Sequence, residues 1–301
     1  MSAVAISSGG NEGELAFALA KDARRERWVM LALTIPGIFV VAGVLLSPVG
    51  WLIWQSLVDE GGHLTLHHYL TLFTEPKRLS YLLNTFLLSA EVTTICSLLA
   101  YPLAFALTTL SERLRKLCMF FVVVPLLTSV LVRTYAWLII LGRRGIVNNV
   151  LTNLGVINEP LDLVYNYFCT VLGMVHVMMP MMVLPLFAAM KSIDGDLARA
   201  ASSLGATPSA AFRDVFLPLT LPGLFAGATL VFVLSLGYYV TPSILGGGKV
   251  IVWAIFLEQT VSFNTQWGPA AAAGLLLLAA TVSALILARV VVGVKAHQPT
   301  L

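Results

Sequence analysis

Long runs of apolar residues, separated by shorter polar segments, dominate this 301-residue chain. A helix needs about 20 residues to cross the hydrocarbon core of a bilayer. Apolar windows of that length or longer lie at residues 28–57, 81–110, 117–141, 168–190, 219–243 and 267–292. Backbone groups in lipid must be satisfied within the element, and these windows are too long and too uniformly apolar for barrel strands. The pattern therefore predicts an all-α integral membrane protein with six transmembrane helices.

Composition agrees with this fold class, since 58% of the residues are hydrophobic and only 11% are charged. The basic residues are unevenly divided between the two sides of the predicted membrane. One side carries Lys21, Arg24, Arg25, Arg27, Arg113, Arg115, Lys116, Lys191, Arg199, Arg213, Arg289 and Lys295; the other carries Lys77, Arg78, Arg143, Arg144 and Lys249. Because basic loops stay in the cytoplasm, both termini are predicted to be cytoplasmic.

Three segments follow from these spans. Residues 1–27 form a predicted cytoplasmic tail, residues 28–292 form the six-helix transmembrane domain, and residues 293–301 form a second cytoplasmic tail. The first apolar run is about twice as long as the apolar region of a secretory signal, so we expect it to be retained as a span.

The chain lacks the sequence patterns of an enzyme. Gly246–Lys249 superficially resembles a phosphate-binding loop, but Val250 follows the lysine where serine or threonine is required. The cysteines have no metal-ligand spacing and are interpreted as packing residues: Cys96, Cys118 and Cys169. His176 is isolated on an apolar span and is interpreted as a packed or path-facing side chain. We expect no metal, no cofactor and no catalytic group on this chain.

Residues 191–220 form a polar segment between two long apolar windows. Asp196 is a candidate helix N-cap, and Gly205 stands where a helix C-cap glycine belongs. Thr207 and Pro208 supply a second cap and a proline at the first helical position, and Pro218 is expected to interrupt the helix that follows. The segment predicts a helix–turn–helix whose small side chains permit close approach of a partner. An interfacial helix that only caps the bundle is the alternative.

This segment resembles the EAA loop of permease subunits in ABC importers, in which E-A-A is followed by three residues, G, nine residues, I, one residue and L-P. The matching positions are Ala200, Ala201, Gly205, Val215, Leu217 and Pro218, whereas Arg199 stands where the family usually has glutamate. The resemblance implies a coupling helix that docks on a separate ATPase, which binds the ATP. The implied contact residues are Arg199, Ala200, Ala201, Leu204, Gly205, Ala206, Thr207, Pro208 and Ala211.

Other segments are similar to the permeases of spermidine/putrescine importers: LTLHHYLTLF, LLNTF, YPLAFAL, VRTYAW and TPSILGGGK. The resemblance covers residues 28–292 and implies the type I importer permease fold in the bacterial inner membrane. It also implies a similar but distinct second permease, two copies of an ABC ATPase, a periplasmic binding protein and a polyamine solute. Another small organic solute, such as an amino-acid-like compound or an organic anion, remains an alternative.

Two ionisable residues lie inside the predicted spans. Glu91 and Arg133 are both about 12 to 15 Å from the outer end of their windows at 1.5 Å per residue. Charged side chains in hydrocarbon are costly and therefore candidates for function. We favour an ion pair between them that fixes helix register, and direct contact with solute is the alternative.

Four aromatic side chains near that depth are candidates for lining a translocation path: Tyr135, Trp137, Tyr238 and Tyr239. Their faces can hold a cationic amine by cation–π contact. Anchoring at the membrane interface, or ordinary packing, is the alternative for each of them.

Two other classes of membrane protein are alternatives to the importer. A self-sufficient secondary transporter usually has more spans, internal repeats and intramembrane acids that bind ions. A channel or a structural subunit does not require a capped cytoplasmic helix pair. The capped segment therefore favours the permease.

Overall fold

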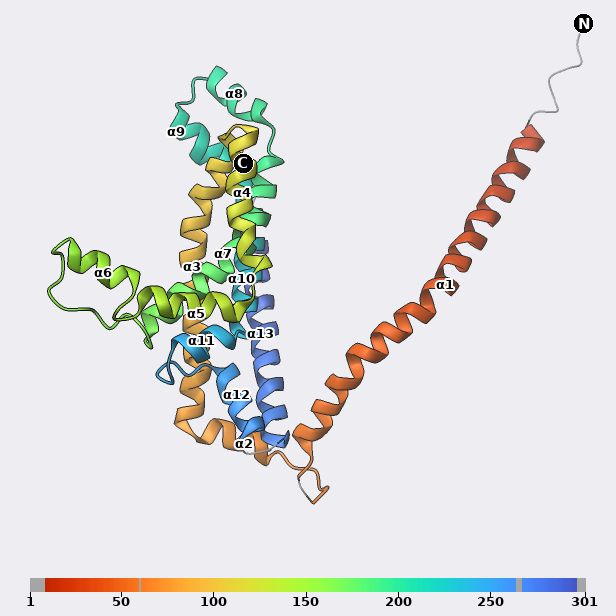
Figure 1. The fold of residues 1–301 in the computed structure, drawn as a ribbon. Helices are drawn as coiled ribbons and strands as arrows, with labels where there is room; N and C mark the ends of the chain where they lie inside the picture. The colour runs from red at the N-terminus through yellow and green to blue at the C-terminus, as the bar shows by residue number, and fades with distance from the viewer. Residues whose placement is uncertain (1–8, 60, 264–266, 297–301) are drawn as a thin grey trace, which may run out of the picture.

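The computed structural model describes residues 9–59, 61–263 and 267–296, and the described residues are almost entirely helical (Figure 1). In chain order the helices are α1 (Gly9–Leu57), α2 (His67–Thr74), α3 (Pro76–Thr109), α4 (Glu112–Leu127), α5 (Val130–Leu141), α6 (Ile146–Asn153), α7 (Tyr167–Lys191), α8 (Gly195–Ser203), α9 (Pro208–Ala211), the π-helical turn η1 (Phe212–Phe216), α10 (Leu217–Leu236), α11 (Val240–Leu245), α12 (Trp253–Ser262) and α13 (Trp267–Ala296). A single isolated bridge, Val58 with Leu64, is the β-type pairing among these residues.

Five of the described helices are long and apolar enough to cross a membrane, and a sixth span results if the bent pair α4 and α5 is counted as one. This agrees with the predicted number of spans. Helix α1 begins at Gly9, so the described part of the predicted N-terminal tail is helical. Residues 1–8 of that tail, and residues 297–301 of the predicted C-terminal tail, lie outside the described residues.

Helices α3, α7 and α10 form the centre of the bundle. Their inward positions are small or flexible, such as Ala100 and Ala104 on α3 and Met174 and Met182 on α7, each 0% exposed. Cys96 is buried in the same cluster, as expected of a packing residue. Small side chains on α3 allow the helices to approach closely, and methionine fills the irregular space that remains.

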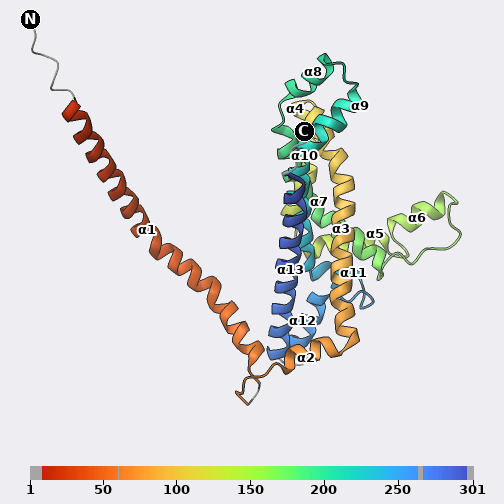
Figure 2. The ribbon, with the colours of Figure 1, turned by 180° about the vertical axis from the view of Figure 1, so that it is seen from behind.

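The bundle has two distinct ends. Helices α8 and α9 lie at one end, beside the C-terminal end of α13, whereas α2 and α12 lie at the other (Figures 1 and 2). Helix α1 contacts α13 near α2, where the rings of Trp51 and Trp267 are 5.7 Å apart, and then leads away from the bundle.

The predicted third span, 117–141, is not straight. Helices α4 and α5 meet at an angle of 105°. Pro125 lies in the last turn of α4, where it provides no N–H, and Thr128 is extended (φ −94°, ψ 148°). Helix α5 therefore runs across the bundle, and α6 projects from its side (Figure 1). Hydropathy failed to predict this break because it records how apolar a segment is and not its direction.

The predicted fifth span, 219–243, is shorter than expected at its C-terminal end. Helix α10 ends at Leu236, and Gly237 follows as its C-cap residue. The chain then forms the separate short helix α11. Tyr238 and Tyr239 therefore lie in the connection between two helices and not within one continuous span.

Candidate functional site

The polar segment 191–220 folds as the predicted helix–turn–helix at the α8 end of the molecule. Helix α8 begins at Gly195, and the side chain of Asp194 accepts a hydrogen bond from the backbone N–H of Asp196 at 2.9 Å. The prediction that Asp196 is the N-cap is therefore wrong by two residues. Asp196 instead lies in the first turn, where its negative charge still favours the helix N-terminus.

The turn after α8 is closed by hydrogen bonds typical of a Schellman motif. The N–H of Gly205 donates to the carbonyl of Ser202, and the N–H of Ala206 donates to that of Ala201, both at 3.0 Å. Gly205 has φ +88°, in the left-handed region that glycine adopts without strain. The predicted role of Gly205 as a terminating glycine is confirmed. Leu204, immediately before it, is 89% exposed.

The second cap is also as predicted. The hydroxyl oxygen of Thr207 accepts from the N–H of Ala210 at 3.3 Å, and Pro208 occupies the first turn of α9. Each helix flanking the Leu204–Gly205 turn thus has a side-chain cap at its start. The turn is held in one shape by local hydrogen bonds on both sides.

Most of the residues implied as coupling contacts lie on one exposed surface, but not all do. Arg199, Ala200, Leu204, Gly205, Thr207 and Pro208 are exposed, and Ala201 and Ala206 are half-buried. Ala211 is only 8% exposed and faces the bundle. Arg199, the departure from the family pattern, forms a 3.1 Å ion pair with Asp196 on the exposed face of α8.

The helix after α9 does not stop at Pro218, contrary to prediction. The chain continues through the π-helical turn η1 into α10, and the N–H of Leu217 donates to the carbonyl of Phe212, five residues earlier. One wider turn places Pro218 at the start of the next α-helical stretch, where its missing N–H is tolerated. Helix α9, η1 and α10 are therefore one continuous helical element, Pro208–Leu236.

Aromatic side chains join this element to α3. The ring of Phe105 lies 5.6 Å from that of Phe212 and 5.4 Å from that of Phe216, both edge to face. Tyr101, one turn before Phe105, forms a 2.9 Å hydrogen bond with the hydroxyl of Thr220. Sequence reasoning missed this cluster, although the i, i+4 spacing of Tyr101 with Phe105 and of Phe212 with Phe216 was a usable signal.

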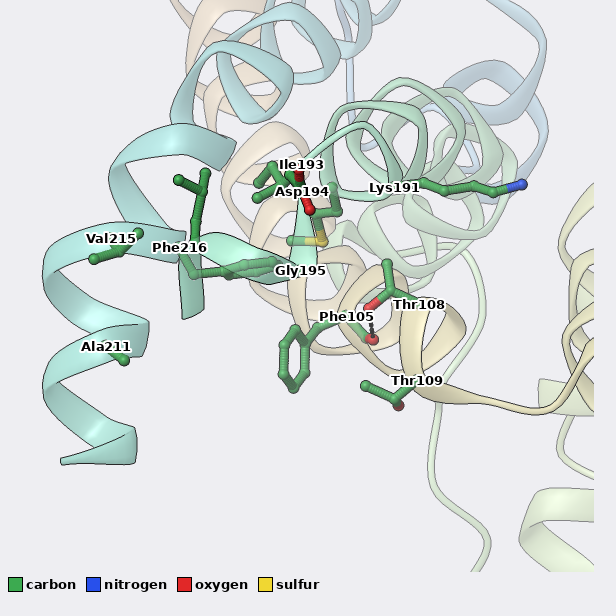
Figure 3. Close-up of a pocket in the computed structure, with 12 residues that line it drawn as sticks. Phe105, Thr108, Thr109, Lys191, Ile193, Asp194, Gly195, Ala211, Val215 and Phe216 are labelled. Carbon is green, nitrogen blue, oxygen red and sulfur yellow. Dashed lines mark hydrogen bonds between the residues drawn. The ribbon is translucent and has the colours of Figure 1, made fainter. Parts of the chain in front are cut away.

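A cavity of about 350 Å³ lies beside the cluster, between the ends of α3 and α7 and the helices of segment 191–220 (Figure 3). It is lined by Phe105, Thr108, Thr109, Met190, Lys191, Ile193, Asp194, Gly195, Leu197, Ala211, Val215 and Phe216. The segment is therefore fixed to α3 through aromatic rings but is not packed tightly against the rest of this end of the bundle.

The predicted ion pair between Glu91 and Arg133 does not form in the described structure. Glu91 instead accepts a 2.6 Å hydrogen bond from the hydroxyl of Tyr167, at the start of α7. The 105° bend before α5 explains the error, because depth was counted along a straight third span. Arg133 lies in the first turn of α5, beyond that bend.

Arg133 and Trp137 lie on the part of α5 that adjoins α7. Trp137 Nε1 donates to His176 Nδ1 at 3.2 Å, with the two rings edge to face. The Nε and Nη1 atoms of Arg133 are buried without a hydrogen-bond partner in the described part of the chain. The structure thus places Trp137 against His176 on α7, with Arg133 one turn earlier on α5.

The remaining aromatic candidates are dispersed. Tyr135 is 55% exposed on α5 and Tyr239 is 37% exposed before α11. Tyr238 packs against the central cluster, and its hydroxyl is buried without a partner among the described residues. The structure does not assemble the four aromatic residues into one cage.

Residues 97–293 match the family described as "Binding-protein-dependent transport system inner membrane component". The chain is 32% identical over 255 residues to a spermidine/putrescine transport system permease protein of Haemophilus influenzae, covering 84% of this chain and 87% of that one. It is 30% identical to a molybdenum transport system permease protein of Mycobacterium bovis, covering 91% and 95%.

Among solved structures, a chain of a bacterial ABC transporter involved in import of the acidic polysaccharide alginate superposes with a TM-score of 0.72, covering 90% of this chain and 98% of that one at 20% identity. At this identity the likeness establishes the fold, which is that of a type I importer permease. This chain belongs to the family of inner membrane components of binding-protein-dependent transport systems, and it is a multi-pass permease subunit of an ABC importer.

Proposed function

We propose that this chain and a second permease line the path by which a polyamine, spermidine or putrescine, enters the cell. The solute is supported by the 32% identical relative, which is named for spermidine and putrescine transport. Glu91, exposed on α3, and the rings of Tyr135, Trp137 and Tyr239 are groups suited to an ammonium ion. A periplasmic binding protein delivers the solute at the α2 end.

The Leu204–Gly205 turn is the observation that carries the coupling role. It presents a large apolar side chain at the end of the molecule, 89% exposed, on a backbone fixed by two caps and a Schellman motif. An exposed leucine on a rigid turn suits a groove on a protein partner. This partner is a cytoplasmic ABC ATPase, present in two copies, which binds and hydrolyses the ATP while the permease itself is not catalytic.

Force from the ATPase passes to the bundle through the aromatic cluster. Movement of segment 191–220 shifts η1, and the rings of Phe212 and Phe216 press on Phe105 of α3. The cavity behind the segment provides space for this displacement. Packed elements of this kind switch between discrete arrangements, here inward-open and outward-open states.

The topology of the proposed assembly follows from charge and exposure. The α8 end faces the cytoplasm, with both termini on that side, because the basic residues at Arg113, Arg115 and Lys116 belong to the same end as α8. Helix α1 packs on the second permease, since the 18-residue apolar window of this helix has no residue buried within this chain.

ATP-dependent uptake in proteoliposomes tests the coupling role. The importer contains this chain, its second permease, the ATPase and the binding protein, and labelled putrescine and spermidine are offered. Gly205→Asp should lower uptake by more than about tenfold, because it places a charge and a strained residue at the proposed contact with the ATPase. Gly155→Asp is the matched control, since Gly155 also has a positive φ and open space around it. An equal loss in both variants would contradict the proposal.

An anionic solute is the second candidate, favoured by one observation. Arg133 carries buried donors without a partner in the described chain, and these suit a negatively charged group. In the same proteoliposomes, ATPase stimulation by a loaded binding protein without polyamine uptake would retain the importer and reject the polyamine.

A further inference from the structure

Arg133 has a charge that the described chain leaves uncompensated. Its Nε and Nη1 atoms are inaccessible to solvent, and neither has a hydrogen-bond partner among the described residues. A guanidinium remains protonated at any physiological pH, so it does not escape burial by losing its charge. The side chain as a whole is partly exposed, but two charged donors withdrawn from solvent without a partner are unfavourable, especially within a membrane. The native assembly therefore requires an acceptor at this position.

The nearest polar neighbours of Arg133 supply donors. His176 Nδ1 accepts from Trp137 Nε1, so the proton of the neutral imidazole is on Nε2. Arg133 lies one turn before Trp137 on α5, and Trp137 contacts His176. The guanidinium and the imidazole Nε2–H are thus both donors. A donor-only cluster with a positive charge selects a negatively charged acceptor.

Several acidic side chains of this chain are already engaged elsewhere. Glu91 accepts from Tyr167 at 2.6 Å, Asp162 pairs with Arg143 at 2.6 Å, and Glu75 pairs with Arg78 at 2.9 Å. Arg133 forms no ion pair within the described residues. A second molecule can supply the counter-charge.

The surface beside Arg133 indicates that the second molecule is a protein. Leu131, Val132 and Tyr135, on the same two turns of α5, are 52%, 65% and 55% exposed. Lipid acyl chains would cover these side chains but offer no acceptor to a guanidinium. A neighbouring membrane protein provides both an apolar surface and a carboxylate.

We propose that Arg133 and His176 form a site for a carboxylate borne by a side chain of the second permease. The inference rests on the proposed function, in which that permease forms the other wall of the path. A cationic solute would be repelled by an uncompensated Arg133, and pairing across the subunit contact removes this repulsion. An anionic solute would offer the same carboxylate chemistry, and the experiment separates the two sources.

Charge reversal tests the site in the complete importer. Arg133→Glu is combined in turn with replacement by lysine of each acidic residue in the spans of the second permease. Arg133→Glu should lower ATP-dependent uptake by at least about tenfold, and one lysine replacement should restore it to within about threefold. Arg144→Glu is the control, because Arg144 is exposed on the connection after α5, and it should change uptake by less than about twofold.

Co-purification of the two permeases in detergent provides a readout that does not depend on the solute. Restored co-purification in one double variant would support the site. This conclusion would hold even if the wild-type importer carried no polyamine, a result that would contradict only the proposed solute. Failure of every lysine replacement to restore uptake or co-purification would overturn the inference. It would equally be overturned if Arg133→Met left co-purification intact and raised only the KM for an anionic solute, since the carboxylate would then belong to the solute.

Discussion

Asn148 on α6 is only 1% exposed and joins the connection before this helix to the segment after it through three hydrogen bonds. Its Nδ2 donates to the carbonyls of Gly142 and Leu161, both at 3.0 Å, and its Oδ1 accepts from the N–H of Leu161 at 2.8 Å. The side chain thus substitutes for backbone pairing in a segment that has no regular partner. The shape of the projecting arm, residues 142–164, depends on this residue.

Asn148→Ala is expected to loosen the arm. The change leaves two carbonyls and one N–H without their partner, and each buried unpaired group costs about 1–3 kcal/mol. Protease sensitivity in residues 154–166 should rise, and the thermal denaturation temperature in detergent should fall. Asn149→Ala, at an exposed neighbour with one 3.3 Å bond to Arg144, should change neither. Identical behaviour of the two variants would refute the role of Asn148.

Residue-scale features were predictable where they depend on neighbours in sequence. Gly205, Thr207 and Pro208 were identified because a left-handed glycine, a capping hydroxyl and a first-turn proline each act within a few residues. The choice between Asp194 and Asp196 as the N-cap of α8 was not predictable, because aspartate is equally favourable as an N-cap at either position. Only the backbone path after α7 decides which carboxylate reaches the free N–H groups.

At the scale of elements, the π-helical turn η1 joins α9 to α10 without a break in the helix. By widening one turn before Pro218, it keeps α9 and α10 continuous and directs the rings of Phe212 and Phe216 toward α3. An interrupted helix, as the proline predicted, would have left segment 191–220 connected to the fifth span by a flexible joint.

Phe105→Ala should therefore uncouple ATP hydrolysis from transport. It removes two edge-to-face contacts, each worth about 0.5–1.5 kcal/mol beyond burial, without touching the exposed Leu204–Gly205 turn. Uptake per ATP hydrolysed should fall severalfold, while ATPase stimulation by the loaded binding protein persists. Phe120→Ala, at a 60% exposed ring on α4, should leave the ratio unchanged. A parallel loss of ATPase and uptake would argue against a transmitting role.

The bend between α4 and α5 shows why element directions were harder to predict than element positions. The apolar window 117–141 exists as predicted, yet it contains two helices at 105°. Pro125 lies in the last turn of α4, but a proline only weakens a helix at that point and does not fix the angle of the bend. The angle is decided by packing of α5 against α7 and α11, around Leu141, Cys169 and Leu245.

At the scale of the whole molecule, α1 determines the outline of the chain. Phe39 and Leu33 on this helix are 79% and 75% exposed, and a groove along one face is lined by small and apolar residues that include Gly37 and Ala42. Small residues allow helices to approach closely within a membrane, where packing replaces the hydrophobic effect as the driving force. We expect the second permease to occupy this groove.

A tryptophan in the groove should disrupt assembly. Ala42→Trp fills the space that a partner helix would use and should reduce co-purification of the second permease by more than about fivefold, because overpacking a close contact is unfavourable. Val44→Trp is the matched control two residues away, at a 67% exposed position outside the groove lining. Reduced assembly with Val44→Trp and not with Ala42→Trp would place the partner on the opposite face.

The sequence by itself determined the class of this protein, the number of its spans and the local helix–turn–helix form of segment 191–220. These depend on apolar length and on short-range capping, which are properties of neighbouring residues. The tertiary structure decided which side chains meet: Glu91 with Tyr167, Trp137 with His176, and Phe105 with Phe212. Such contacts depend on where helices bend and where they cross one another. Packing between helices that are far apart in the sequence sets both, and no property of a single segment encodes them.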